Sequence, residues 1–222
     1  MKHDISFLHT AEIHIATFSK LMDDHAPNLL VRHDVNSTLL DQAQTKGIHP
    51  ALESKIRAAM QSAASTGAKV VVCTCSTIGG IAEQAATKNQ FGSMRIDRAM
   101  ADKAVKLGQN ILIVAALQST LEPTQNLLNS SAKRAGLSPS IDLLLINDAW
   151  HFFENNEHTL YLQTIAKALK NLQKQYDVIV LAQASMAGVI AYCQDVTMPI
   201  ISSPKIGVLS AIKAYNNIAA NS

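Results

Sequence analysis

The chain has 222 residues, of which 48% are hydrophobic and 16% charged, and its formal net charge is +2. This composition supports a buried core in one large or two small domains, and the absence of a basic tract argues against nucleic acid or an acidic membrane as a partner. Three cysteines argue against a disulfide framework, the charged N-terminus is unlike a signal peptide, and no stretch approaches about 18 apolar residues, so we expect a cytoplasmic protein.

Short apolar strands alternate with amphipathic helices in the first half of the chain. Strands are predicted at 4–8, 29–31 and 70–73. Helices are predicted at 11–24, 38–45, 50–65 and from the end of the third strand to about 88. Residues 89–92 are the predicted linker to the second half.

The second half repeats this alternation. Strands are predicted at 110–116, 141–146, 176–181 and 199–201. Helices are predicted at 96–107, 123–135 and 160–172, after the segment 182–188 through 192, and at 206–215. This order is typical of an α/β fold with parallel sheets and right-handed crossovers.

The two halves follow a similar plan, because matching strands are separated by 105 to 112 positions. The third strands align as VVVCTCSTIGG and VIVLAQASMAG, and this alignment pairs Cys75 with Ala184 and Ser76 with Ser185. A repeated plan of this kind favours two similar halves over the alternative, which is one doubly wound domain.

We therefore predict two pseudo-symmetric lobes, each a mainly parallel sheet flanked by helices, with the site in the cleft between them. The first lobe is expected to comprise residues 1–91 plus 206–222 and to carry Cys75. The second lobe is expected to comprise residues 92–205 and to carry Ser185.

The third strand ends in a thiol and two hydroxyls, which belong to Cys75, Ser76 and Thr77. In open α/β sheets, ligands bind at the carboxyl ends of the strands. Cys75 is therefore the candidate reactive residue, while Cys73 is expected in the core. A metal site is not expected, because no further cysteine or histidine stands at zinc-binding spacing.

These residues resemble the aspartate/glutamate racemase superfamily, which also includes hydantoin racemases, maleate isomerases and arylmalonate decarboxylases. The resemblance covers nearly the whole chain. It is most specific at Val70–Thr77 and is supported by the segments ISFLHTAE, IVAALQSTLEPT and LAQASMAG. It implies an isomerase that uses no cofactor or metal, forms a homodimer, and acts at the α-carbon of a small carboxylate or amino acid.

The resemblance assigns Cys75 as the acid/base that moves the α-proton. Hydroxyls at the strand ends would hold the substrate carboxylate and the developing enediolate. They belong to Thr10, Ser76, Thr77, Ser119, Thr120 and Ser185. Racemases of this group use a second cysteine, which the alignment expects at Ala184. One-thiol isomerisation or decarboxylation therefore rivals racemisation, and Cys193 is expected to lie too far along the chain to substitute.

Two other functions stay open. A non-catalytic carboxylate-binding protein would keep the cleft and lack the chemistry. A Cys–His hydrolase would need a histidine beside Cys75, and His9 and His14 are the candidates. Arg95 could bind a carboxylate through two hydrogen bonds, or could form a structural pair with Asp97.

Overall fold

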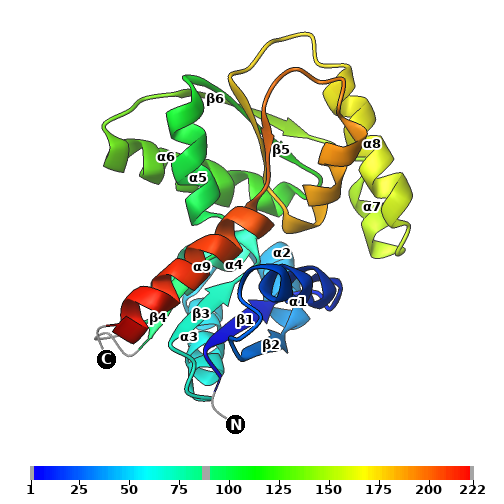
Figure 1. Cartoon of the computed structure of the whole chain (residues 1–222). Helices are drawn as coiled ribbons and strands as arrows, with labels where there is room; N and C mark the ends of the chain where they lie inside the picture. The colour runs from blue at the N-terminus through cyan, green and yellow to red at the C-terminus, as the bar shows by residue number, and fades with distance from the viewer. Residues whose placement is uncertain (1–2, 87–90, 221–222) are drawn as a thin grey trace. The chain divides into compact units, whose positions relative to one another are not determined.

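The computed structural model describes residues 3–86 and 91–220, which divide into two compact units (Figure 1). The first unit is Met1–Ala99 with Pro204–Ser222, and the second is Met100–Ser203. Each unit holds one four-stranded sheet, and all paired strands are parallel. The predicted α/β fold, with two parallel sheets flanked by helices, is confirmed.

The sheet of the first unit has the strand order β2-β1-β3-β4. Its strands are β1 (Ile5–His9), β2 (Val31–Val35), β3 (Val70–Cys73) and β4 (Gly92–Arg95). Its helices are α1 (Ile13–His25), α2 (Ser37–Lys46), α3 (Pro50–Ala64), α4 (Ser76–Glu83) and α9 (Ser203–Ala220). The β1 side chain of Phe7 packs on Phe18 of α1, whereas Val71 of β3 packs in a core cluster with residues of α2, α3 and α4. Helices therefore cover both faces of this sheet.

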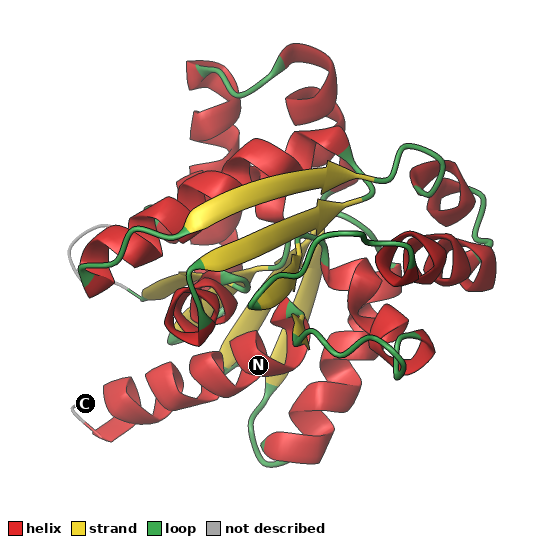
Figure 2. Cartoon of the chain, turned by 90° about the horizontal axis from the view of Figure 1, so that it is seen from above, coloured by secondary structure: helices red, strands yellow, loops and turns green. Residues whose placement is uncertain are grey.

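The sheet of the second unit has the matching order β6-β5-β7-β8. Its strands are β5 (Asn110–Ala115), β6 (Ser140–Leu145), β7 (Val178–Leu181) and β8 (Ile200–Ile201). Its helices are α5 (Arg98–Leu107), α6 (Leu121–Ala135), α7 (Trp150–Glu154) and α8 (His158–Lys170), with 3-10 helices η1 (Gln118–Thr120) and η2 (Ala184–Tyr192). Figure 2 distinguishes the strands, in yellow, from the helices, in red.

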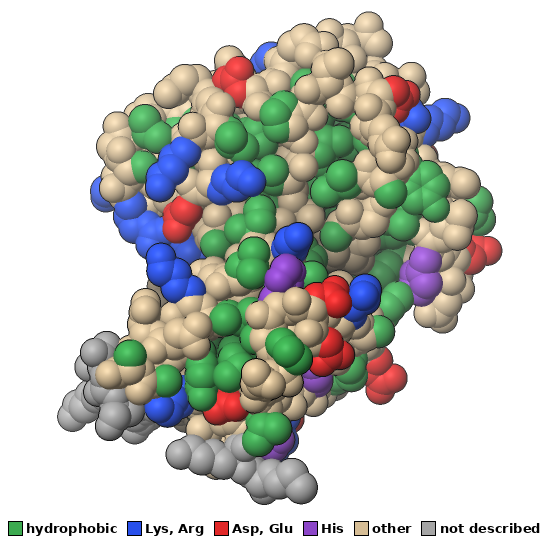
Figure 3. Space-filling view, viewed as in Figure 1, with side chains coloured by type: hydrophobic (Ala, Val, Ile, Leu, Met, Phe, Trp, Pro, Cys, Tyr) green, Lys and Arg blue, Asp and Glu red, His purple; other side chains and the backbone are tan. Residues whose placement is uncertain are grey.

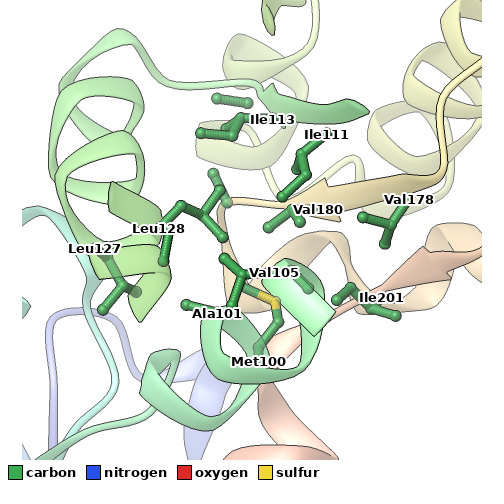
Figure 4. Close-up of a cluster of buried hydrophobic side chains, with 14 of the residues drawn as sticks. Met100, Ala101, Val105, Ile111, Ile113, Leu127, Leu128, Val178, Val180 and Ile201 are labelled. Carbon is green, nitrogen blue, oxygen red and sulfur yellow. The ribbon is translucent and has the colours of Figure 1, made fainter. Parts of the chain in front are cut away.

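The core of the second unit follows from the alternation of side chains along its central strands. Ile111 and Ile113 of β5 point to one face, where they pack with Leu128 of α6, as Figure 4 shows. Leu112 and Val114 point to the other face and pack in a second cluster with residues of α8 and η2. A strand buried on both faces needs a continuous apolar run, which is why β5 and β7 were predictable from sequence.

The C-terminal helix α9 belongs to the first unit. A Cβ atom added to Gly92 of β4 would lie 3.2 Å from Cδ1 of Ile218, so α9 runs close to that strand. Gly207 approaches the loop after β4 even more closely, since a Cβ there would lie 2.2 Å from the carbonyl oxygen of Ile96. Within the described residues, no helix is long and apolar enough to cross a membrane.

Two strands differ from their prediction. β2 lies at 31–35 instead of 29–31 and includes Arg32, His33 and Asp34, because an edge strand paired on one side tolerates polar residues. β4 begins at Gly92, where a linker was expected, and pairs with β3. The linker residues 89–90 lie outside the described residues.

Two helical segments also differ from their prediction. The helix predicted after residue 188 begins earlier, at Ala184, and is a 3-10 helix that ends at the predicted residue, Tyr192. The helix α7 was not predicted because its five residues are too few to show a helical stripe. In α7 the rings of Trp150 and Phe153 stack with centroids 4.7 Å apart, and both side chains pack against the core of the second unit.

Candidate functional site

Cys75 stands at the carboxyl end of β3 and is the N-cap residue of α4, with extended backbone angles of φ −99° and ψ 119°. The hydrogen bonds between β1 and β3 continue one residue beyond the end of β3, because the Thr74 N–H donates to the Leu8 carbonyl at 3.0 Å. Cys75 is partly exposed, whereas Cys73 and Cys193 are buried. A helix N-terminus favours an anionic group beside it, so this thiol stands where both solvent access and local charge suit reaction.

Cys73 has a different environment from Cys75. Its side chain is fully buried in the core of the first unit, and its Sγ donates a weak hydrogen bond to the Cys75 carbonyl at 3.6 Å. Burial and the neighbouring Cys75 thiol raise the pKa of Cys73 well above its usual range. Cys73 is therefore held as an unreactive neutral thiol, in keeping with its expected core role.

The hydroxyl residues of the first unit lie at the ends of two strands. Thr10 directly follows β1, and Ser76 and Thr77 begin α4, and all three are largely buried. Ser76 already has an internal partner, because its side chain hydrogen-bonds to Asp97. The pairing of β1 with β3 brings the end that carries Thr10 next to the end that carries Cys75.

Arg95 and Asp97 form a buried ion pair beside the start of α4. The Arg95 Nε lies 2.6 Å from Oδ1 of Asp97 and its Nη2 lies 2.9 Å from Oδ2. Burial alone would raise the pKa of Asp97, but the charge and hydrogen bonds of Arg95, with a further bond from Ser76, hold this pKa below its usual range. Of the two roles open to Arg95, the structure favours the structural pair.

A chain of hydrogen bonds occupies His9, one of the two histidines proposed for a Cys–His pair. Its Nδ1 is 2.8 Å from Thr74 Oγ1 and its Nε2 is 2.8 Å from His33 Nδ1, while His33 Nε2 is 3.0 Å from Ser19 Oγ. Burial, and then the nearby His33 and His14, lower the pKa of His9 to about 3. Both ring nitrogens of His9 are thus bonded to Thr74 and His33 and neither is bonded to Cys75, which weakens the hydrolase hypothesis for His9.

In the second unit, the predicted hydroxyls follow β5 and β7. Ser119 and Thr120 lie in η1, where the Thr120 hydroxyl donates to the Leu117 carbonyl at 2.7 Å. Ser185 lies in η2, and its Oγ is 2.9 Å from the hydroxyl oxygen of Tyr161, whose pKa burial raises. The fold therefore brings these three residues to the carboxyl end of the second sheet.

The backbone hydrogen bonds identify Gln183 as the second-unit counterpart of Cys75. The Ala182 N–H donates to the Val114 carbonyl at 2.9 Å, as the Thr74 N–H donates to Leu8 in the first unit, so Ala182 matches Thr74. The next residue is Gln183, which is the N-cap of η2 as Cys75 is of α4. The strand-based alignment is thus shifted by one residue from the sequence alignment that paired Cys75 with Ala184.

Gln183 was missed from the sequence, although counting from the end of each β-branched run would have found it. Its side chain is buried, and its Oε1 accepts hydrogen bonds from the N–H groups of Ala116 at 2.7 Å and Leu117 at 3.1 Å. An amide held in this way fixes the turn after β5. A neutral amide is neither an acid nor a base near neutral pH, so unlike a thiol it cannot transfer a proton to carbon.

A shallow pocket of about 210 Å³ lies elsewhere in the second unit, at the C-terminal ends of α5 and α6. Figure 3 shows lysine and arginine side chains on this side of the unit. Arg134 in its lining already pairs with Asp102 at 2.7 Å. Because helices run opposite to the strands, the pocket lies at the amino edge of the sheet, away from Ser119 and Ser185. Among residues 3–86 and 91–220, no three His, Cys, Asp or Glu side chains are grouped to hold a metal ion.

Comparison with known proteins gives one family match and several similar structures. The family model described as Asp/Glu/Hydantoin racemase matches residues 10–211. The aspartate racemase of Picrophilus torridus is 14% identical with a TM-score of 0.66, over 96% of this chain and 94% of that chain. The glutamate racemase of Francisella tularensis, in complex with D-glutamate, is 14% identical with a TM-score of 0.70, over 98% of this chain and 82% of that chain.

A further similar structure is an arylmalonate decarboxylase, which is 11% identical with a TM-score of 0.58, over 96% of this chain and 92% of that chain. At these identities the similarity shows a common fold. A search of curated proteins gives no match.

Proposed function

Since the chain belongs to the Asp/Glu/hydantoin racemase family, we propose that it is a cofactor-independent enzyme acting at the α-carbon of a small carboxylate or amino acid. Cys75 is the acid/base. As a thiolate it takes the α-proton and leaves an enediolate, and the resulting thiol then returns a proton to carbon. The hydroxyls of Thr10, Thr77, Ser119 and Ser185 hold the carboxylate. The single O–H of Ser76 is already donated to Asp97 and that of Thr120 to the Leu117 carbonyl, so these two predicted residues would have to release those partners to bind it. The enzyme works as a cytoplasmic homodimer.

The observation that carries this proposal is the position of Cys75. It is partly exposed at a strand end and caps a helix, while Cys73 in the same unit and Cys193 in the second unit are buried. An α-proton next to a carboxylate is a very weak acid, so its removal needs a base that is accessible and surrounded by hydrogen-bond donors. The partly exposed Cys75 thiol is an accessible base. The buried hydroxyls at the same edge of the sheet are candidate hydrogen-bond donors.

Gln183 supports one-thiol chemistry over racemisation by two thiols. The residue that matches Cys75 in the strand-based alignment carries an amide, and in the sequence-based alignment it is Ala184. Neither side chain can return a proton to the opposite face of the α-carbon. We therefore expect Cys75 to remove and return protons on one face, or to protonate an enediolate formed by loss of carbon dioxide.

Proton exchange measured by NMR tests this proposal. Candidate substrates in deuterated buffer are both enantiomers of glutamate and aspartate, together with an arylmalonate, because the similar structures are named for these compounds. We expect deuterium at the α-carbon with retained configuration, or decarboxylation. In Cys75→Ala the rate should fall by about 100-fold or more, the usual contribution of a general acid/base. A substrate that Cys75→Ala turns over as fast as wild type would contradict the proposal.

Cys193→Ala is the matched control for this experiment. It removes a thiol of the second unit that is buried and far along the chain from the strand ends, so turnover should match wild type. Racemisation of the substrate by wild type, with loss of deuterium stereospecificity, would contradict the one-thiol part of the proposal and leave the role of Cys75 standing.

The second candidate function is a non-catalytic carboxylate-binding protein. The observation that favours it is the same Gln183, whose oxygen is fixed by two backbone N–H groups and cannot take part in proton transfer. This function predicts that D- or L-glutamate raises the melting temperature in a thermal-shift assay while no deuterium enters the ligand. Any exchange that depends on Cys75 would exclude it.

A further inference from the structure

The segment that follows Phe91 is hydrogen-bonded to α4 near both ends of the helix. Three of its side chains bond to the helix: Ser93 Oγ donates to the Ala82 carbonyl at 2.6 Å, Arg95 Nη2 donates to the Ser76 carbonyl at 3.3 Å, and Arg98 Nε donates to Glu83 Oε1 at 2.8 Å. These contacts fix α4 to β4 and to the turn beyond it. Of the three, only the Arg95 contact reaches the first turn of the helix, directly after Cys75.

Arg95 and Asp97 hold that first turn from two sides, and we call this pair the Arg95–Asp97 clamp. Arg95 binds the Ser76 carbonyl, while Asp97 accepts a hydrogen bond from the Ser76 side chain. The two charged groups bind each other through two further contacts of 2.6 and 2.9 Å. Their side chains are only 4% and 1% exposed, so solvent cannot replace any of these bonds.

Gly79 completes the arrangement. A Cβ atom added there would lie 3.0 Å from Arg95 Nε, 3.1 Å from Cζ and 3.2 Å from Nη2. The absence of a side chain therefore lets the guanidinium lie against the helix. At Gly80, one residue further on, an added Cβ would lie at an ordinary 3.7 Å from Arg95 Nη1.

A buried ion pair of this kind adds little to the free energy of unfolding compared with an apolar pair in its place. Removing two charges from water costs several kcal/mol, and an apolar pair of similar size is often as stable or more so. What a rigid two-point ion pair can supply is a fixed geometry for the groups that it binds. Here those groups are the carbonyl and hydroxyl of Ser76, which adjoins the thiol of the proposed site.

We propose that the Arg95–Asp97 clamp is the positioning device of the proposed active site, in which it holds the first turn of α4 so that its backbone N–H groups surround Cys75 and attract an anionic substrate. This inference rests on the proposed function for the role of Cys75. Arg95 and Asp97 act through Ser76 and the helix, so they are positioning residues and are not catalytic.

A ratio of alkylation rates tests the clamp without any substrate. Cys75 is treated with iodoacetate, which is anionic, and with iodoacetamide, which is neutral, at one pH. The ratio of the two rates cancels the thiolate fraction and the exposure of the thiol, and so reports the local charge. Fragment-ion mass spectrometry separates Cys75 from Cys73 and Cys193, whose alkylation would reveal unfolding.

The expected result uses two glycines of the same helix. Wild type should show a higher iodoacetate-to-iodoacetamide ratio than N-acetylcysteine. Gly79→Ala pushes the guanidinium by a few tenths of an ångström, which breaks the 3.3 Å bond to the Ser76 carbonyl, and should lower the ratio by about threefold, within the effect of a helix N-terminus on an anion. Gly80→Ala, which leaves the clamp untouched, should keep the wild-type ratio.

A second variant keeps the test decisive if Gly79→Ala does not fold. Arg95→Lys retains the charge but cannot bind Asp97 at two points, so the ratio should fall in the same direction. An unchanged ratio in folded Gly79→Ala or in Arg95→Lys would overturn the clamp. Failure of the proposed function is a separate result, because it would appear as exchange that persists in Cys75→Ala while the alkylation ratios still respond.

Discussion

His9 provides the sharpest test of the packing beside the site, because it is a titratable group with no exposed surface. It lies among aromatic rings, with Phe18 at 5.5 Å and His33 at 5.1 Å between ring centroids, and hydrogen-bonds at both nitrogens. Burial, and the nearby His33 and His14, lower its pKa from 6.5 to about 3. The folded state therefore keeps His9 neutral, while the unfolded chain binds a proton below pH 6.5.

The sign of the pH dependence follows from this difference. The stability that His9 contributes is complete above pH 6.5 and is lost as the pH falls from 6.5 toward 3. Each pH unit in that window is worth up to about 1.4 kcal/mol, so lowering the pH from 6.5 to 4.5 should remove roughly 2 to 3 kcal/mol through His9 alone. His14, whose pKa is lowered to about 4 by burial, and the half-buried His33, whose pKa is also lowered, contribute in the same direction. The carboxylate of Asp34, beside His33, opposes the lowering at that residue.

Urea denaturation at pH 6.5, 5.5 and 4.5 measures this effect as the free energy of unfolding. His9→Gln removes the titrating group and should flatten the pH dependence, although its stability at pH 6.5 will be lower because Thr74 and His33 lose a partner. His25→Gln, on the exposed end of α1, is the control and should keep the wild-type slope. Equal slopes in wild type and His9→Gln would refute the assignment of acid sensitivity to His9.

Two further predictions concern the first unit. Gly207→Ala would place a Cβ 2.2 Å from the Ile96 backbone oxygen, so the free energy of unfolding should fall by about 1–3 kcal/mol in urea denaturation, and wild-type stability would contradict the close packing of α9. Asp97→Asn leaves the Arg95 charge buried without its partner and should cost about 3–5 kcal/mol in the same assay. The exposed Asp102→Asn is its control and should cost under about 1 kcal/mol, and equal losses in the two variants would contradict the burial argument.

The sequence predicted the strands whose physics is local. β3 and β7 are buried on both faces, so each must be a continuous apolar run, and each was found with nearly correct ends. β2 was predicted with shifted bounds and β4 was missed, because neither of these edge strands carries an apolar run. Pairing on one side alone accommodates Arg32 and Asp34 in β2 and the sequence GSMR in β4, which show no apolar pattern.

The residue types of the candidate site were predictable from the sequence, but the contacts between segments far apart in the chain were not. The thiol and hydroxyl types at strand ends pointed to Cys75 and its neighbours, since parallel strands bring their carboxyl ends to one edge. The partners of those groups were not predictable. His9 meets Thr74 only through the register of β1 with β3, and Arg95 reaches Ser76 only because β4 pairs with β3.

The second-unit counterpart of Cys75 shows a different limit. The segments VVVCTCSTIGG and VIVLAQASMAG were aligned by the similarity of their residues. That alignment paired Cys75 with Ala184, which is one residue away from the pairing that the structure gives. Backbone hydrogen bonds leave no such freedom, and they match Cys75 to Gln183. This shift of one residue changes the counterpart of Cys75 from Ala184, with an inert methyl group, to Gln183, whose buried amide fixes the turn after β5.

The measurement that tests the central claim most directly is α-carbon deuterium exchange by wild type, Cys75→Ala and Cys193→Ala, all confirmed as folded by their thermal transitions. If Cys75 is the acid/base, wild type and Cys193→Ala should exchange the α-proton of at least one of the tested carboxylates, or decarboxylate a malonate, at similar rates. Cys75→Ala should be about 100-fold slower or inactive. Equal rates in Cys75→Ala and wild type would contradict the claim that this thiol carries the chemistry.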